Sequence, residues 1–362
     1  MNTFLEDTLQ ADLELLKATE KANKAIIAHF NLLEHPYRGG PDFRFLYTTD
    51  QVKEAIAKCI LLTVERVNPV YMYGPFGTGK STIIRRLYAL LRRDQRFNVK
   101  FIILHDRVSG NSLLRDILDA FGVKPARSYD LSLKRFQRYL IGELSEEEYK
   151  ADKEGKKDYY DESKIPVLLL DEGQHLQKDA LRLIHSLLNF ETPSFKRLQI
   201  VIAGQEGLAK NILGMGELAS RMKGIGIYHM SAPELEKMLK YRWVVAGGKE
   251  EELPFPNDRS AYQVLFEYTK GLPRDVIKVA DDVLRHLMAH NKKQITIAEI
   301  EAIIQENNLT KAPSDSSYGW YVLKITRFIR DKPTCRWVRT ETTYTRTQAG
   351  SEKNQQTSKP AN

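Results

Sequence analysis

The stretch Gly74-Pro-Phe-Gly-Thr-Gly-Lys-Ser81 decides the fold class of this 362-residue chain. It fits the pattern G-x-x-x-x-G-K-[ST], in which glycines let backbone N–H groups close around phosphate groups. Residues 69–73 before it form an apolar run typical of a buried strand, and residues 82–91 after it have helical spacing. The alternative is a glycine-rich surface turn that matches by chance, which this strand, loop and helix context disfavours. We therefore expect a phosphate-binding loop.

The loop residues have separate expected roles at a bound nucleoside triphosphate. Lys80 is expected to reach the β- and γ-phosphates, and the Ser81 hydroxyl is expected to ligate Mg2+. The other residues assigned to the nucleotide are Gly74, Pro75, Phe76, Gly77, Thr78, Gly79 and Thr82.

Length and composition bound the class of protein. The chain suffices for about two to three domains, and its 42% hydrophobic content permits real cores. No stretch approaches the roughly 18 to 20 apolar residues of a membrane span, and residues 1–7 lack the profile of a secretory signal. A cytoplasmic protein without a membrane partner is therefore expected. Cys59 and Cys335 lie far apart and are interpreted as ordinary thiols.

The order of predicted elements divides the chain into domains. An amphipathic helix is expected over residues 1–28, and an α/β domain over residues 29–230. Its continuous apolar strands alternate with helices, which indicates a parallel sheet flanked by helices; they are predicted at 69–73, 99–104, 166–171 and 198–203. Residues 231–308 read as a small all-helical domain, in which Ser231 and Thr296 begin capping boxes of the form S/T-x-x-E.

Two segments carry unusual charge. Residues 145–164 mix both signs densely, so we expect an exposed insertion whose role stays open. Residues 311–362 hold ten basic and four acidic residues, a net +6 of the chain's +8. This basic and aromatic tail, counted from residue 309, permits contact with nucleic acid or docking to a protein partner. Residues 340–362 are expected to be disordered.

Paired carboxylates follow the third predicted strand. Asp171 and Glu172 come directly after the apolar run 166–170. Because ligands collect beyond the carboxyl ends of parallel strands, Asp171 is expected to hold Mg2+ and Glu172 to polarise the water that attacks the γ-phosphate. The alternative is that the pair merely begins a helix, where carboxylates suit the positive dipole end. The phosphate loop upstream favours the catalytic interpretation.

The order of these motifs resembles the AAA+ ATPases of the ExeA-like group, which includes the transposition regulators TnsC and TniB. The resemblance covers about residues 28–306 and rests on the phosphate loop and on four further segments: Val167–Glu172, Ala203–Gln205, Leu218–Met222 and Gly271–Val276. It implies a P-loop AAA+ sheet domain followed by a helical lid, with ATP and Mg2+ as ligands.

The resemblance also implies roles for single residues. Gln205 matches the sensor-1 position, and Arg274 matches sensor 2 on the lid. Arg221 lies where such proteins carry an arginine finger that acts on the nucleotide of the next subunit. Lys100 and Arg107 flank the second strand, where related ATPases contact the DNA backbone. Each arginine alone also fits an ordinary exposed surface position.

The implied function is an ATPase that regulates DNA transposition. It would form rings or filaments on duplex DNA and link a target site to a transposase or target-selector protein. The alternative is an ExeA-like motor or signalling ATPase that acts on a protein substrate. The membrane span and cell-wall-binding region expected of a secretion-type protein are not seen after residue 308 in this sequence, which favours the first reading. An initiator-like loader is disfavoured because no winged-helix pattern follows the lid.

Overall fold

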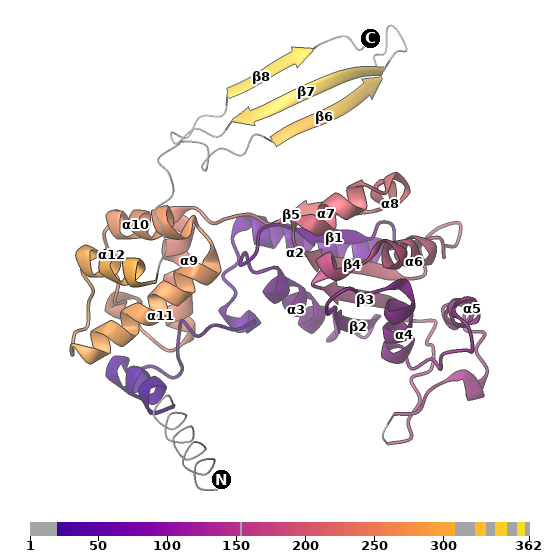
Figure 1. Ribbon diagram of the computed structural model, residues 1–362, viewed down its shortest axis with the longest axis horizontal. Coiled ribbons are helices and arrows are strands. Elements are labelled where there is room, and N and C mark those ends of the chain that lie inside the picture. Colours follow the sequence, from indigo (N-terminus) through magenta and orange to yellow (C-terminus); the bar gives the residue numbers. More distant parts are fainter. Residues whose placement is uncertain (1–19, 153, 308–322, 331–336, 346–352, 359–362) are drawn as a thin grey trace, which may run out of the picture. The chain divides into compact units, whose positions relative to one another are not determined.

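The computed structural model describes residues 20–152, 154–307, 323–330, 337–345 and 353–358. The chain divides into two compact units, residues 1–309 and 310–362. Figure 1 shows the first unit as a strand-containing region followed by a group of helices, α9 to α12.

A five-stranded sheet organises the first unit. Its strands are β1 (Val70–Tyr73), β2 (Phe97–Ile103), β3 (Ile165–Asp171), β4 (Gln199–Gly204) and β5 (Lys223–Gly226), in the order β2-β3-β4-β1-β5. Every neighbouring pair is parallel. The carboxyl ends of β1, β3 and β4 therefore meet at one edge of the sheet.

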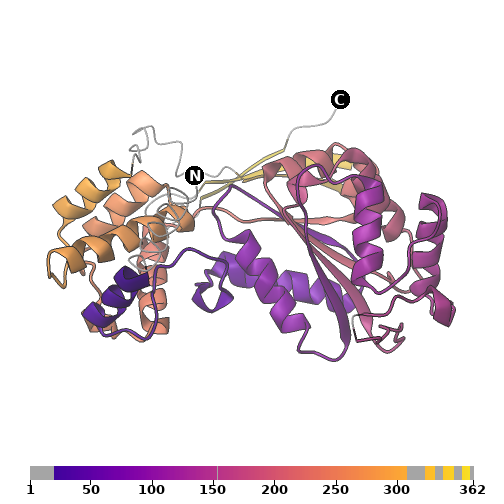
Figure 2. The same ribbon diagram turned by 60° about the horizontal axis from the view of Figure 1, so that its bottom comes forward.

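Helices cover both faces of the sheet (Figure 2), and alternation of side chains along the strands builds a core on each face. In β3, Val167 and Leu169 pack against α2 (Asp50–Glu65) and α3 (Lys80–Leu91). Leu168 and Leu170 belong to the core on the other face, as successive side chains of a strand must. That core includes α4 (Gly110–Ala120), α5 (Tyr129–Tyr139), α6 (Lys178–Leu188), α7 (Glu206–Leu213) and α8 (Gly216–Arg221). The predicted fold class, a parallel sheet flanked by helices, is confirmed.

The helical C-terminal part of the first unit, called the lid below, contains four helices within the described residues. They are α9 (Ala232–Val245), α10 (Arg259–Thr269), α11 (Pro273–Ala289) and α12 (Ile297–Glu306), and they share a third core. Capping boxes begin α9 at Ser231 and α12 at Thr296, as predicted. Within residues 20–152 and 154–307, and the strand residues beyond, no helix is long and apolar enough to cross a membrane. The short 3-10 helices are η1 (Phe43–Phe45), η2 (Glu146–Glu148), η3 (Gly173–His175) and η4 (Glu250–Glu252).

The segment that precedes α2 packs on the lid, although the sequence assigned residues 29–47 to the α/β domain. Phe30, Leu32 and Tyr37 lie in the lid core. The buried guanidinium of Arg242 in α9 donates to the carbonyls of Pro36, Arg38 and Phe45 over 2.9 to 3.2 Å. The segment was assigned to the other domain because its contacts are with residues about 200 positions later, which no local sequence pattern indicates.

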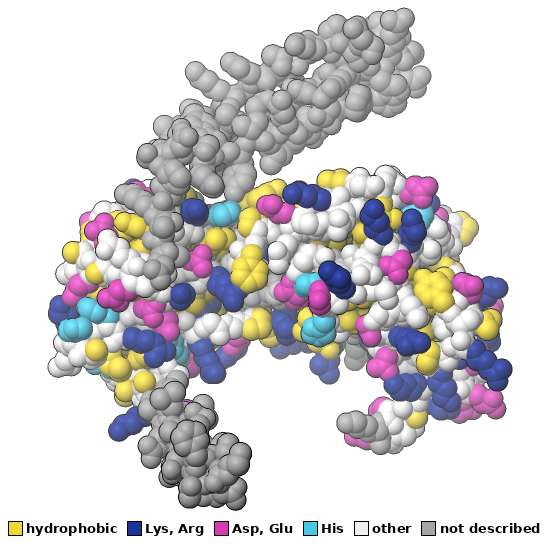
Figure 3. All heavy atoms as spheres, in the orientation of Figure 1, with side chains coloured by type: hydrophobic (Ala, Val, Ile, Leu, Met, Phe, Trp, Pro, Cys, Tyr) yellow, Lys and Arg dark blue, Asp and Glu magenta, His cyan; other side chains and the backbone are white. Residues whose placement is uncertain are grey.

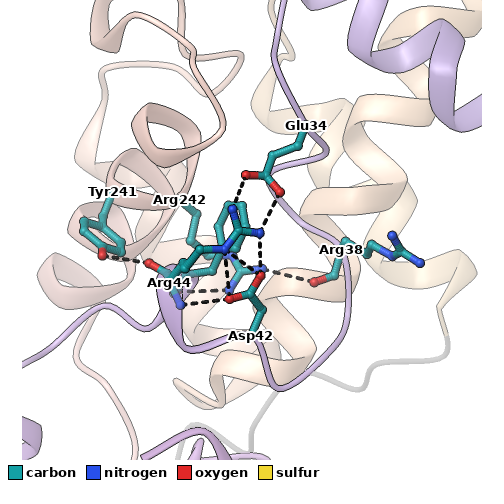
Figure 4. A network of polar contacts seen from close by, with 7 residues as sticks. Glu34, Arg38, Asp42, Arg44, Tyr241 and Arg242 are labelled. Atoms are coloured by element: carbon teal, nitrogen blue, oxygen red, sulfur yellow. Dashed lines mark hydrogen bonds and ion pairs between the residues drawn. The ribbon is translucent and has the colours of Figure 1, made fainter. Parts of the chain in front are cut away.

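Further polar contacts brace this segment (Figure 4). Arg44 forms ion pairs with Glu34 at 2.8 Å and Asp42 at 2.7 Å, and the Tyr241 hydroxyl donates to the Arg44 carbonyl at 2.8 Å. Burial lowers the pKa of Arg242 to about 10. The segment between the helix of residues 20–30 and α2 is thus tied to α9 at several points.

The charged insertion is more ordered than its composition suggests. Tyr149 is buried in the core beside α5, so the expectation that no part of residues 145–164 joins a core is wrong there. The centre of its ring lies 6.2 Å from the centre of the Tyr139 ring, and the ring centres of Tyr160 and Tyr139 are 5.5 Å apart. Charged residues face solvent while these aromatic rings supply the apolar contact that holds the insertion.

The second unit contains a separate antiparallel sheet. Its strands are β6 (Leu323–Arg330), β7 (Trp337–Thr345) and β8 (Lys353–Ser358), in that order. The expectation of disorder from residue 340 is therefore wrong for residues 340–345 and 353–358. Four of the nine residues of β7 are threonines, and the strand also contains Trp337, Val338 and Tyr344; these residue types fit an extended strand. The rest of the predicted tail lies outside the described residues.

Candidate nucleotide-binding site

The phosphate loop joins β1 to the first turn of α3. Gly77 and Gly79 have positive φ values of 84° and 92°, which the loop conformation needs and glycine adopts without strain. A Cβ on Gly74 would lie 1.9 Å from the Ile227 carbonyl oxygen, so this position also requires glycine. α3 begins at Lys80, and the orphan N–H groups of a helix start favour an anion. Thr82, in the same turn, donates its backbone N–H to the Gly79 carbonyl at 3.0 Å.

The Lys80 ammonium is folded onto its own loop. Nζ donates to the carbonyls of Gly74 at 2.9 Å and Pro75 at 2.6 Å, and to the Thr78 hydroxyl at 3.3 Å. Burial lowers the pKa of Lys80, while the charges of Glu172, Asp171 and Glu206 act in the opposite direction. The acceptors of this buried ammonium are uncharged carbonyl and hydroxyl oxygens. Phosphate oxygens suit it better, because they would supply the negative charge that these groups lack.

The two predicted magnesium ligands lie side by side. The Ser81 hydroxyl donates to Oδ1 of Asp171 at 3.2 Å, and the Glu172 backbone N–H donates to the same oxygen at 2.9 Å. Asp171 is buried, which raises its pKa, although both of these hydrogen bonds oppose the shift. A hydroxyl and a carboxylate oxygen are ligands that suit Mg2+, so the residues present fit that ion.

Glu172 and Gln205 lie at the ends of the neighbouring strands β3 and β4. Glu172 has a left-handed backbone with φ of 60°, and Gln205 precedes α7 without capping it through its side chain. A residue that the sequence analysis did not select, Gln174, contacts both. Its Nε2 donates to Oε2 of Glu172, and its Oε1 accepts the Gln205 backbone N–H at 3.0 Å. Its position two residues after Glu172 is the one signal in the sequence that could have marked it.

Arg274 lies against the phosphate loop, although it belongs to the lid. Its backbone N–H donates to the Gly77 carbonyl at 3.3 Å, and its guanidinium carbon stands 4.5 Å from the centre of the Phe76 ring. The first turn of α11 therefore touches the tip of the loop. The structure brings this predicted sensor residue to the nucleotide side of the sheet domain.

Arg221 does not lie with the other candidates. It ends α8 and donates to the side chain of Asn189. Two residues later, Lys223 pairs in register with Val70 at the start of β1, whereas the phosphate loop follows the end of β1. Because the strands are parallel, Arg221 lies near the opposite edge of the sheet from its own phosphate loop.

The two residues predicted to contact DNA differ in availability. Lys100 forms an ion pair with Asp158 of the charged insertion, and only 19% of its side chain is exposed. Arg107 is exposed in the turn after β2, with φ of 49°. The pairing of Lys100 was not predictable because it depends on a contact across 58 residues.

Residues 65–212 match the family model described as an AAA domain. The General secretion pathway protein A of Aeromonas hydrophila is 27% identical over 284 residues, which cover 76% of this chain and 47% of that protein. The chain thus spans about half the length of this curated relative.

Two solved structures share the fold. CDC6P from Pyrobaculum aerophilum superposes with a TM-score of 0.54 at 16% identity, covering 75% of this chain and 72% of that one. The Aeropyrum pernix ORC2 protein gives a TM-score of 0.51 at 12% identity, covering 73% and 68%. The chain therefore has a parallel, helix-flanked sheet with a helical C-terminal part, the fold of these two structures, and its residues 65–212 are similar to an AAA domain.

Proposed function

We propose that this protein binds ATP with Mg2+ and hydrolyses it at the phosphate loop. The observation that carries the proposal is the hydrogen bond between Ser81 and Asp171, which pairs a hydroxyl with a carboxylate at the residue that follows the buried Lys80. In the proposal, Ser81 and Asp171 would hold Mg2+, and the ion would supply positive charge against the phosphates. Lys80 exchanges the carbonyls of Gly74 and Pro75 for phosphate oxygens.

The remaining residues are proposed to act on the attacking water and the γ-phosphate. Glu172 polarises the water, because it stands at the carboxyl end of β3 next to Asp171. Gln205 orients the water or the phosphate from the end of β4. Arg274 supplies positive charge from the lid, and its contacts with Phe76 and Gly77 support this role.

We propose further that a second copy of the chain completes the site. Arg221 is anchored to Asn189 near the far edge of the sheet, so a role in hydrolysis requires the nucleotide of a neighbouring subunit. Hydrolysis and homo-oligomerisation are then coupled, since neither the loop nor the arginine is sufficient alone.

For the task of the oligomer, we propose regulation of DNA transposition. ATP would favour rings or filaments on duplex DNA, hydrolysis would release them, and the C-terminal unit would recruit a transposase or target-selector protein. The net charge of +8 supports an anionic partner, and six of these charges belong to residues 311–362.

The DNA surface of the first unit is proposed to be built around Arg107. Lys100 contributes only if its ion pair with Asp158 opens. Figure 3 shows basic and acidic side chains interspersed on one face of the described residues. The sequence has no base-reading motif, so the contact would be to the DNA backbone and sensitive to salt.

One experiment tests the assembly. The protein is incubated with ATP or a slowly hydrolysed analogue, with and without duplex DNA, and imaged by electron microscopy at low salt. DNA-bound rings or filaments that need nucleotide are expected. Their absence under these conditions would overturn the DNA proposal, while phosphate release in the same samples tests ATP hydrolysis independently.

A second candidate is a motor or signalling ATPase that acts on a protein. The similarity to General secretion pathway protein A over 76% of this chain favours it. The same assay separates the two, because this candidate predicts nucleotide-dependent oligomers whose formation and ATP turnover do not change when duplex DNA is added.

A further inference from the structure

Gln174 connects the two strand ends that carry proposed catalytic residues. Its amide nitrogen donates to Oε2 of Glu172 after β3, and its amide oxygen accepts the backbone N–H of Gln205 after β4 at 3.0 Å. Both hydrogen bonds thus use the same side-chain amide, one through its nitrogen and one through its oxygen. Gln174 therefore sets the Glu172 carboxylate relative to the start of α7.

The surrounding backbone is built to allow this connection. Gly173 is buried, and a Cβ there would lie 2.5 Å from Cγ2 of Ile202 in β4. A Cβ on Gly204 would lie 3.1 Å from the Gln174 backbone nitrogen. The turn after β3 and the end of β4 thus approach more closely than side chains at these two positions would permit.

The backbone conformation of Glu172 is a second, independent observation that surrounding contacts hold this residue in place. Its φ of 60° is a left-handed conformation that residues with a Cβ seldom adopt. Such conformations persist where surrounding contacts enforce them, and they gather at functional sites. The contacts that enforce this one include the Glu172 N–H to Asp171 and the Gln174 amide.

The chemistry of the bridge requires a primary amide. The Glu172 carboxylate needs a donor, whereas the Gln205 N–H needs an acceptor, and the glutamine amide offers both, on separate atoms at the end of one side chain. Glutamate at position 174 would present oxygen to both groups and place two carboxylates in contact. Asparagine is one methylene shorter, and methionine has a similar length without the polar pair.

We propose that Gln174 is a positioning residue for ATP hydrolysis. It occupies Oε2 of Glu172, so that Oε1 is presented to the attacking water, and it holds this carboxylate in register with Gln205. The inference rests on the proposed ATPase function. Gln174 is not one of the residues proposed to contact the nucleotide, and it acts only through Glu172 and the end of β4.

The test compares Gln174→Met with the wild-type chain in steady-state ATP hydrolysis. We expect kcat to fall by about 10- to 100-fold, as for loss of an oriented general base, while KM changes by less than about threefold. Gln177→Met, an exposed glutamine three residues away, is the matched control and should leave both constants unchanged. Thermal unfolding of each variant checks that the fold is intact.

Two further readouts separate positioning from a merely structural effect. Gln174→Glu should move the acidic limb of the pH–rate profile to higher pH, because adjacent carboxylates favour protonation of one of them. In the double variant with Glu172→Gln, Gln174→Met should cause no further loss of kcat, since both changes remove the same action. Additive losses, an unchanged pH profile, or a rise in kcat would overturn the inference.

The outcomes also distinguish this inference from the proposed function. If the wild-type chain hydrolyses ATP, Glu172→Gln lowers turnover by about 100-fold and Gln174→Met matches the wild type, only the role of Gln174 fails. If the wild-type chain and Glu172→Gln both lack ATP turnover, with and without DNA, the ATPase proposal itself fails.

Discussion

The Ser81 hydroxyl donates a hydrogen bond to Asp171, although 90 residues separate them in the chain. Ser81 belongs to the first turn of α3, after β1, and Asp171 is the last residue of β3. Strand β4 lies between β1 and β3, so the contact spans the carboxyl edge of the sheet. The Mg2+ prediction follows from this pair.

Asp171→Asn should reduce ATP turnover by about 100-fold or more and raise the Mg2+ concentration needed for half-maximal turnover, because a neutral amide is a weaker ligand for this ion. Mg2+ titration of phosphate release measures both effects, and chelation of Mg2+ should abolish turnover of the wild-type chain. Asp130→Asn, an exposed carboxylate in the first turn of α5, is the control. An unaltered Mg2+ requirement in Asp171→Asn would remove Asp171 from the metal site.

Lys80→Ala and Glu172→Gln should separate binding from turnover. Lys80→Ala loses the ammonium that contacts the phosphates, so affinity for ATP should fall by at least about tenfold. Glu172→Gln keeps the site geometry without its base, so binding should persist while turnover falls by about 100-fold or more. Titration with a fluorescent ATP analogue and a phosphate-release assay measure the two steps. Normal hydrolysis by Glu172→Gln would show that another group activates the water.

The ATP turnover lost in Arg221→Ala should be partly restored by mixing this variant with Lys80→Ala. Alone, Arg221→Ala and Lys80→Ala should each lose most turnover. In a mixed oligomer the Arg221 of a Lys80→Ala chain can serve the intact phosphate loop of an Arg221→Ala chain, so a mixture should regain part of the activity. Arg182→Ala, an exposed arginine on α6, is the control for charge alone. A mixture no more active than its components would contradict a shared site.

Arg242→Met should destabilise the first unit by about 3 kcal/mol, since it leaves two buried carbonyls and one partly buried carbonyl without their donor. Chemical denaturation followed by tryptophan fluorescence measures this, because Trp243 lies next to Arg242 in the lid core. Arg38→Met is a matched control: Arg38 offers only its carbonyl to this network and its side chain is exposed (Figure 4). Equal stabilities of the two variants would argue against the role given to Arg242.

Glu299→Gln should remove stability in a pH-dependent way. Lys292 and the capping contacts of Thr296 hold the pKa of Glu299 well below its usual range. A carboxyl group with a lowered folded pKa stabilises the fold above its unfolded pKa of about 4.3, and that contribution is lost as the pH falls further. The variant should therefore be less stable by about 1 kcal/mol at pH 7, mostly from the lost cap, and closer to the wild type near pH 3. Thermal unfolding at both values checks this, and an equal difference at the two pH values would contradict it.

Local patterns in the sequence determined much of the first unit. Continuous apolar runs located β1, β2, β3 and β4, since buried parallel strands need apolar residues on both faces. β5 was missed because its four residues include Gly224 and Gly226, which give no apolar period. Ser231 and Thr296 marked helix starts correctly because a capping box is formed by residues three apart.

The phosphate loop and the Asp171–Glu172 pair could also be predicted from the sequence, because each is a short segment whose expected role depends on its own residues. Tertiary structure alone decided the strand order, the attachment of residues 31–46 to α9 through Arg242, the pairing of Lys100 with Asp158 and the bridge made by Gln174. Each of these joins groups that no fixed spacing relates. Periodicity reports whether a position is buried, whereas the partner it meets there depends on how distant elements pack.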